Sequence, residues 1–244
     1  SICVALLAAL FVRDTPEQLG LSRDGTPPQP DPDSKTGSSM TSEHLWTARQ
    51  AIFTAQFLLI SIAGIAYATP WGVVVSQMTL HLTEKGFEID VIASLLGSLA
   101  LVSILGRLTG ILGDKLNPRY VIIAGLIVEG IGTAGFYFVD SKLTASICLL
   151  LIGIGFGSTY VCIPALFSDY FGRKAFGTTA GTRMLITGVF NGAGPWVTGL
   201  VADKSGYFIP FMALAVLCFI GSFAAAVCTD PGPPPGSKSE PEPA

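Results

Sequence analysis

Three ionisable side chains interrupt long runs of apolar residues in this sequence: Arg107, Glu129 and Arg183. A charge at membrane depth costs at least about 2.5 kcal/mol on insertion scales, so such a residue usually faces a cavity or a partner. The planar guanidinium of arginine binds a carboxylate through two parallel hydrogen bonds. The two arginines are therefore candidates for a clamp on a carboxylate. Alternatively, both side chains extend to the nearby membrane surface.

Glu129 offers acid–base chemistry instead. It lies ten residues beyond Arg119, which is about 15 Å along a helix and close to the middle of a bilayer. A carboxyl group in such a place can accept and release a proton during a transport cycle. It can also stay protonated and hydrogen-bond a neighbouring helix. The residues themselves leave both roles open.

The composition shows which elements must carry these residues. Half of the sequence is hydrophobic, 13% is charged and the mean hydropathy is +0.60, whereas ordinary soluble domains carry about 25% charged residues. A helix of about 20 residues crosses a bilayer, and backbone groups in lipid must bond internally, so each long apolar block is predicted to be a helix. The blocks cover residues 50–82, 91–113, 120–139, 143–168, 175–202 and 208–228.

We therefore predict an all-α membrane protein. The stretch 1–12 is too short to span a membrane and is interpreted as the end of a truncated transmembrane helix. Residues 13–47 are rich in Pro, Ser, Asp and Gly and predict a cytoplasmic linker. A helical bundle is expected over 48–228 and a disordered cytoplasmic tail over 229–244. We count five complete transmembrane helices plus the truncated first one, arranged as a six-helix bundle.

The distribution of basic residues predicts the orientation, because cytoplasmic loops are enriched in Lys and Arg. With the linker inside the cell, nine basic residues face the cytoplasm and three face the opposite side. This orientation places the C-terminus in the cytoplasm. The cytoplasmic set is Arg13, Arg23, Lys35, Arg49, Lys115, Arg119, Arg173, Lys174 and Lys238, and the opposite set is Lys85, Lys142 and Lys204.

The first long block contains Pro70 and is about a third longer than one crossing needs. Proline removes a helical hydrogen bond, so we expect a kink or a break there. Polar residues beside a broken transmembrane helix often line a cavity, which makes Tyr67 and Gln77 candidates to bind substrate. Alternatively, the hydroxyls of Thr69 and Ser76 only satisfy the carbonyls that the proline frees.

Patterns of catalytic and metal-binding residues are absent from the sequence. The five cysteines lie in apolar blocks without paired spacing, and we expect them to be small buried hydrophobic residues. The two histidines are His44 and His81, and the apolar blocks hold no paired aspartates. We therefore expect no enzymatic activity, no cofactor, no metal and no nucleic-acid partner.

Glycines four residues apart recur in three blocks. Such pairs lie one turn apart on a helix face and let another helix approach closely. The run GIGFGS at 153–158 is similar to a nucleotide-binding loop, but no strand precedes it, so we interpret it as a packing surface. The pairs are Gly106 and Gly110, Gly153 and Gly157, and Gly188 and Gly192.

The loop that follows the first of these pairs carries a family resemblance. Residues 110–120, GILGDKLNPRY, resemble the cytoplasmic-loop signature of the major facilitator superfamily. Asn117 stands where that signature usually has glycine, and asparagine also adopts positive φ. In this family the loop acid belongs to a cytoplasmic gate, and the alternative is a static surface ion pair worth about 1 kcal/mol or less. The resemblance implies a gate made of Gly110, Asp114, Lys115 and Arg119, in which Asp114 pairs with Arg119 and the helix N-terminus near 176–178.

Three further segments extend the resemblance. TPEQLGLSRDG, residues 15–25, resembles the start of the central loop of the superfamily. Residues 153–181 are similar to the tenth helix and following loop of monocarboxylate and oxalate/formate carriers, and residues 191–211 are similar to their eleventh-to-twelfth helix region. The resemblance covers nearly the whole chain. It implies the C-terminal half, helices seven to twelve, of a twelve-helix carrier in the cell (inner or plasma) membrane.

The resemblance also implies roles for single residues. Arg107 resembles an arginine in the eighth helix of monocarboxylate carriers, although its interval to the loop acid is one residue shorter. Aligned on Gly194 and Pro195, Thr187 takes the position of a basic residue in oxalate carriers, and Arg183 lies one turn nearer the cytoplasm. The ninth helix is peripheral in the family, which favours a structural role for Glu129. The candidate substrate-binding residues are Arg107, Arg183, Tyr67, Gln77, Thr187 and Asn191.

We therefore expect secondary active transport of a small organic anion, of monocarboxylate or oxalate/formate type, by alternating access. The expected partners are the anion, a co-transported proton or a counter-anion, the lipid bilayer, and the N-terminal six-helix half of the same carrier. The alternatives are a sugar or drug exporter of the same superfamily and an inactive truncated fragment.

Overall fold

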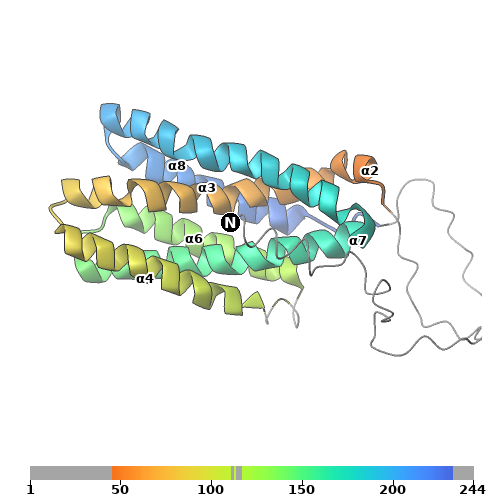
Figure 1. Ribbon diagram of the computed structural model, residues 1–244, viewed down its shortest axis with the longest axis horizontal. Coiled ribbons are helices and arrows are strands. Elements are labelled where there is room, and N and C mark those ends of the chain that lie inside the picture. The colour runs from red at the N-terminus through yellow and green to blue at the C-terminus, as the bar shows by residue number, and fades with distance from the viewer. Residues whose placement is uncertain (1–45, 111–112, 114–116, 233–244) are drawn as a thin grey trace, which may run out of the picture. The chain divides into compact units, whose positions relative to one another are not determined.

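The computed structural model describes residues 46–110, 113 and 117–232. All regular secondary structure in these residues is helical, as the apolar blocks predict (Figure 1). The predicted truncated helix at 1–12, nearly all of the linker and most of the tail lie outside the described residues. The helices are α2 (Ala48–Ile52), α3 (Ala55–Glu84), α4 (Ile89–Leu108), α6 (Pro118–Tyr137), α7 (Lys142–Ser205) and α8 (Phe208–Val227).

Helix α7 consists of two arms. The backbone of Gly172 has φ 68° and ψ 175°, which no helix accommodates. Glycine reaches positive φ without steric cost, so the chain turns back on itself there (Figure 1). The first arm covers Lys142–Gly172 and the second arm covers Phe176–Ser205.

The helix boundaries follow from local sequence. The hydroxyl of Thr54 caps the start of α3. Asn117 caps α6 and is followed by Pro118, whose missing N–H costs nothing at the first helical position. Ser141 opens α7 with a capping box, and Gly206, with φ 74°, closes it.

Six helical segments of the described chain are long and apolar enough to cross a membrane: α3, α4, α6, the two arms of α7, and α8. The prediction of an all-α membrane protein with a six-helix bundle is confirmed. The expected count of five complete transmembrane helices is one short, because all six complete segments lie between Ala55 and Val227. The stretch 1–12 is therefore not needed to complete the bundle.

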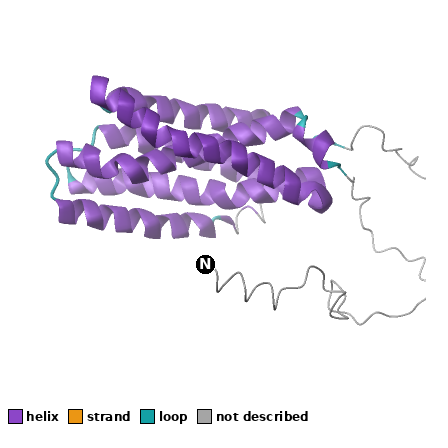
Figure 2. Cartoon of the chain, turned by 45° about the horizontal axis from the view of Figure 1, so that its top comes forward, coloured by secondary structure: helices purple, strands orange, loops and turns teal. Residues whose placement is uncertain are grey.

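The helices lie side by side (Figure 2). Helix α7 packs against α3, α4 and α6, and α8 packs against α3 and α6. One buried cluster, around Trp46, Phe57 and Phe167, lies near the turn between the two arms. A second cluster, around Leu95 and Phe211, lies at the other end of the helices. The second arm of α7 is the least covered of the six segments.

Two of the three glycine pairs bring helices together as predicted. A Cβ atom on Gly106 would lie 2.7 Å from the carbonyl oxygen of Ile154, and one on Gly110 would lie 2.8 Å from Val161. Facing them, a Cβ on Gly157 would lie 2.9 Å from the backbone nitrogen of Arg107. Helix α4 and the first arm of α7 therefore touch backbone to backbone.

The third glycine pair is different. A Cβ atom on Gly188 or on Gly192 would meet nothing within 4 Å. The expected close approach of another helix at these two positions is therefore absent among the described residues. Both glycines lie on the second arm of α7, the segment with the largest uncovered surface.

Helix α3 is continuous through Pro70, so the predicted break does not occur. Proline has no N–H, and the carbonyl of Ala66 one turn earlier loses its helical partner. The thiol of Cys218 on α8 donates to that carbonyl with an S···O distance of 3.4 Å. The neighbouring helix thus replaces the bond that Pro70 removes, whereas the hydroxyl of Thr69 is buried without a partner.

Candidate substrate-binding site

Helix α3 and the two arms of α7 border a pocket of about 400 Å³. Four of the six predicted substrate-binding residues line it, and they come from α3 and from the second arm. They are Tyr67, Arg183, Thr187 and Asn191.

Arg183 lies deep in this pocket. Its side chain is 2% exposed, and the guanidinium atoms Nε and Nη1 are buried without a hydrogen-bond partner. The guanidinium packs on Gly64 of α3, where a Cβ atom would lie 3.0 Å from Nη1. A side chain that extended to the membrane surface would be exposed, so Arg183 has the geometry of a pocket residue.

The polar residues of the second arm share one helix face. Arg183, Thr187 and Asn191 are spaced four residues apart, which places them one above another. The Thr187 hydroxyl oxygen and the Asn191 Oδ1 are buried without hydrogen-bond partners. Gly72 of α3 makes room for Asn191, because a Cβ atom there would overlap Oδ1. Several unsatisfied polar atoms therefore converge on one cavity, which is the arrangement of a ligand site.

Aromatic rings form the rest of the wall. Trp71 on α3 stacks on Phe156 of the first arm of α7, with ring centroids 3.9 Å apart and planes inclined by 13°. Tyr67 packs against Phe156 at 5.6 Å and against Tyr160 at 6.4 Å. These rings carry the apolar part of the pocket.

Arg107 lies outside the pocket lining. Its side chain is exposed at the end of α4, and its guanidinium carbon lies 5.0 Å from the ring centroid of Tyr160. Tyr160 itself lines the pocket. The structure therefore separates the two predicted clamp arginines by an aromatic ring, and Arg107 makes a cation–π contact with that ring.

Gln77 is also outside the pocket lining. Its amide nitrogen donates to the carbonyl of Pro195 at 3.0 Å, and its amide oxygen accepts from the Tyr207 hydroxyl at 3.2 Å. Gln77 thus ties α3 to the second arm of α7 and to the turn before α8. These bonds make it a residue that positions helices around the pocket.

Glu129 is fully buried on α6, and both carboxyl oxygens are without hydrogen-bond partners. It faces the first arm of α7, where a Cβ atom on Gly155 would lie 2.7 Å from the Cβ of Glu129. The Tyr67 hydroxyl lies within electrostatic reach of both Glu129 and Arg183. Glu129 is therefore outside the pocket lining, and Tyr67, which lines the pocket, interacts with both Glu129 and Arg183.

The predicted gate is only partly described. Asp114 and Lys115 lie outside the described residues, so their pairing is not seen. Gly110 packs on Val161, and the Nη2 atom of Arg119 donates to the carbonyl of Ala226 in the last turn of α8. A cation at the C-terminal end of a helix is favoured by the helix dipole.

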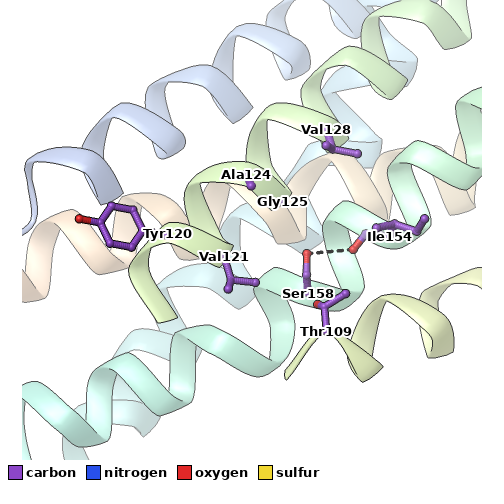
Figure 3. Close-up of a pocket in the computed structure, with 8 residues that line it drawn as sticks. All are labelled: Thr109, Tyr120, Val121, Ala124, Gly125, Val128, Ile154 and Ser158. Atoms are coloured by element: carbon purple, nitrogen blue, oxygen red, sulfur yellow. Dashed lines mark hydrogen bonds between the residues drawn. The ribbon is translucent and has the colours of Figure 1, made fainter. Parts of the chain in front are cut away.

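A second pocket, of about 270 Å³, lies between the end of α4, α6 and the first arm of α7 (Figure 3). Two of its hydroxyl groups are already bonded: Ser158 donates to the carbonyl of Ile154 at 2.9 Å, and Thr109 donates to that of Gly106 at 2.7 Å. The residues that line this pocket include no cationic side chain. The pocket around Arg183 is the better candidate for a polar ligand.

The sequence analysis missed the aromatic wall and the two glycines of α3. Trp71, Phe156 and Tyr160 are ordinary members of apolar blocks, and no spacing rule relates residues on different helices. The glycines carry a signal: Gly64 and Gly72 are eight residues apart, as are Arg183 and Asn191. Equal spacing on two helices indicates small residues that face large ones.

Comparison with known proteins agrees with the helical architecture. Residues 108–244, more than half of the chain, match the model of the family described as Major Facilitator Superfamily. The chain is 24% identical over 157 residues to "Multidrug resistance protein MdtG" of Dickeya zeae, covering 62% of this chain and 38% of that protein. It is 29% identical over 175 residues to "Uncharacterized MFS-type transporter MJ1560" of Methanocaldococcus jannaschii, covering 68% of this chain and 41% of that protein. The chain thus spans about two fifths of the length of these relatives.

Proposed function

Because the chain belongs to the Major Facilitator Superfamily, we propose that it forms the C-terminal six-helix half of a secondary active transporter for a small organic anion. An N-terminal six-helix half supplies the opposite wall of the pathway. The two halves rock around a site near the middle of the membrane and expose it to each side in turn. The uncovered surface of the second arm of α7 fits such an arrangement.

The observation that carries this proposal is the deep burial of the Arg183 guanidinium, which interacts with the Tyr67 side chain but keeps free hydrogen-bonding capacity. Two of its nitrogens are buried without partners in a pocket large enough for a ligand. An uncompensated buried cation is costly, and a bound anion offsets that cost. A carboxylate matches the planar guanidinium through two parallel hydrogen bonds.

The other predicted residues have different roles in the proposed site. The Thr187 hydroxyl and the Asn191 amide bond the polar part of the ligand, and Tyr67 closes the pocket on the side of α3. Arg107 attracts the anion from behind Tyr160 and does not clamp it jointly with Arg183. Gln77 holds α3 and the second arm at a fixed spacing.

The gate and the location complete the proposal. Asp114, with Gly110, Lys115 and Arg119, forms a cytoplasmic gate that makes and breaks contacts as the halves rock. The carrier resides in the cell membrane with its C-terminus in the cytoplasm, as the distribution of basic residues favours.

The role of Glu129 determines whether the proposed transport is coupled to a proton or to a counter-anion. A carboxyl group that is buried without hydrogen-bond partners is costly to ionise. In a structural role it stays protonated throughout the cycle, and transport then proceeds by exchange for a counter-anion. In a coupling role it exchanges a proton with the pocket, where Tyr67 interacts electrostatically with both Glu129 and Arg183.

One alternative function is a drug exporter of the same superfamily. The aromatic wall and the name of the Dickeya zeae relative favour it. A sugar exporter has less support, because a sugar carries no negative charge that would pair with the buried guanidinium of Arg183. A chain that acts without the N-terminal half would be an inactive fragment.

The test is uptake by the complete carrier, purified and reconstituted in proteoliposomes. Radiolabelled lactate, formate and oxalate are supplied with and without an inward proton gradient or an internal counter-anion. Uptake of an acid supports the proposal, and export of cationic drugs without uptake of any acid would replace it with the alternative. Acceleration by the proton gradient that disappears in Glu129→Gln assigns coupling to Glu129.

A further inference from the structure

The wall of the pocket around Arg183 is aromatic over most of its apolar part. Tyr67 and Trp71 of α3 and Phe156 and Tyr160 of the first arm of α7 all line it. Each ring lies within 6.4 Å of another, centroid to centroid. The four rings therefore form one continuous surface that faces the same cavity as the buried guanidinium.

The size of the cavity exceeds what a short acid needs. A volume of about 400 Å³ lies in the range of pockets that hold drug-sized ligands. Lactate, formate and oxalate carry one methyl group or none, so each would neutralise Arg183 and leave the aromatic surface against water. A ligand that also carries a ring covers that surface and removes it from water.

The distance along α3 between the position of Arg183 and that of the aromatic wall sets the length of such a ligand. Arg183 packs at the level of Gly64, and Trp71 lies seven residues further along the helix. Seven residues correspond to about 10 Å. The arginine side chain covers part of this distance. A short alkyl chain between the ring and the carboxylate of the ligand covers the rest.

We propose that the substrate of this pocket is an aryl-alkanoic acid, whose carboxylate binds Arg183 and whose ring lies on the Trp71–Phe156 wall. This inference rests on the proposed function, since it names the class of organic anion that the same pocket takes. Both arms of α7 and helix α3 then contact a single ligand. The ring contributes about tenfold in affinity, as an aromatic pair does.

The test compares two acids that differ only by a phenyl ring, propionate and 3-phenylpropionate. Initial uptake rates of the complete carrier in proteoliposomes give kcat/KM for each. We expect the wild type to prefer 3-phenylpropionate by about tenfold or more. Trp71→Leu should reduce this preference to about threefold or less, whereas Trp71→Phe, which keeps a ring, should retain most of it.

Three further variants separate the effect of the ring from the effects of charge and of folding. Phe223→Leu removes an exposed aromatic ring on α8, outside the pocket, and should leave the preference unchanged. Tyr160→Leu alters the wall at a half-exposed position, so it serves if Trp71→Leu does not fold. Arg183→Gln should lower the uptake of both acids by the same factor.

The outcomes distinguish this inference from the function on which it rests. Equal or better transport of propionate by the wild type would overturn the aromatic substrate and leave anion transport standing. Equal losses for both acids in Trp71→Leu would make Trp71 structural and also overturn the inference. Transport of neither acid, nor of any other carboxylate, would overturn both.

Discussion

Arg183 shows how a single residue can point to a ligand. Its burial on Gly64 leaves two guanidinium nitrogens without partners, and native proteins satisfy nearly all such groups. The described chain contributes no bond to these two atoms, so an external anion is the simplest source of one. Glu129, by contrast, is buried away from the pocket lining, and a single proton removes its charge.

Cys228 provides a prediction that depends on pH. Burial raises the pKa of its thiol to about 11, although the nearby Arg119 acts in the opposite direction. Because the thiolate is the reactive form, alkylation at pH 8 should be at least about a hundredfold slower than for an exposed cysteine, and should accelerate with pH up to about 11. Peptide mapping after timed maleimide treatment measures the rate, and fast labelling at pH 8 would contradict the buried placement.

At the scale of helices, close contacts between α4 and the first arm of α7 hold the bundle together. A Cβ atom on Gly157 would meet the Gly106 Cα at 2.8 Å and the Arg107 nitrogen at 2.9 Å, and backbone atoms cannot move aside cheaply. Gly157→Ala should therefore lower the free energy of unfolding by about 1–3 kcal/mol. Thermal unfolding of the purified carrier in detergent measures the change.

The matched control for this change is Gly97→Ala on α4. A Cβ atom there would meet nothing within 4 Å, and alanine is the better helix former. This variant should unfold at the wild-type temperature or slightly above it. Equal unfolding temperatures for the two variants would contradict the backbone contact between the helices.

The helices were largely predictable from the sequence, whereas their mutual arrangement was not. Apolar blocks located all six spans because lipid requires internally bonded backbone. The glycine pairs at 106 and 157 indicated close packing, but spacing alone could not tell that Gly188 would face open space. Of the two effects predicted for Pro70, the break does not occur, and the thiol that replaces the missing bond lies on a helix distant in sequence.

The candidate site was predictable in part for the same reason. Arg183, Thr187 and Asn191 were found because polarity inside an apolar block is visible in one segment. Gln77 is polar too, yet its partners Pro195 and Tyr207 lie far along the chain. The aromatic wall forms only when α3 packs against the first arm of α7, and no local sequence pattern predicts that packing.

At the scale of the whole molecule, the proposed transport cycle requires movement between two halves around the pocket. The gate proposal predicts that Asp114→Asn slows turnover about tenfold or more, because a transport step loses its cytoplasmic contact. The dissociation constant of a bound acid should change by less than about twofold, since the pocket is untouched. Uptake rates and equilibrium binding, measured on the same preparation, separate these effects. Turnover of Asp114→Asn at the wild-type rate would indicate that Asp114 and Arg119 form a static ion pair.

The central claim is that Arg183 binds the anion that the carrier moves, and one comparison tests it most directly. Initial uptake of an acid that the wild type accepts is measured for Arg183→Gln and for Lys204→Gln, which removes an equal charge from an exposed position on the same arm. Loss of one member of a buried charged pair costs about 2–5 kcal/mol, so Arg183→Gln should lower kcat/KM by about thirtyfold or more. Lys204→Gln should stay within about twofold of the wild type. Full uptake by Arg183→Gln would contradict the account.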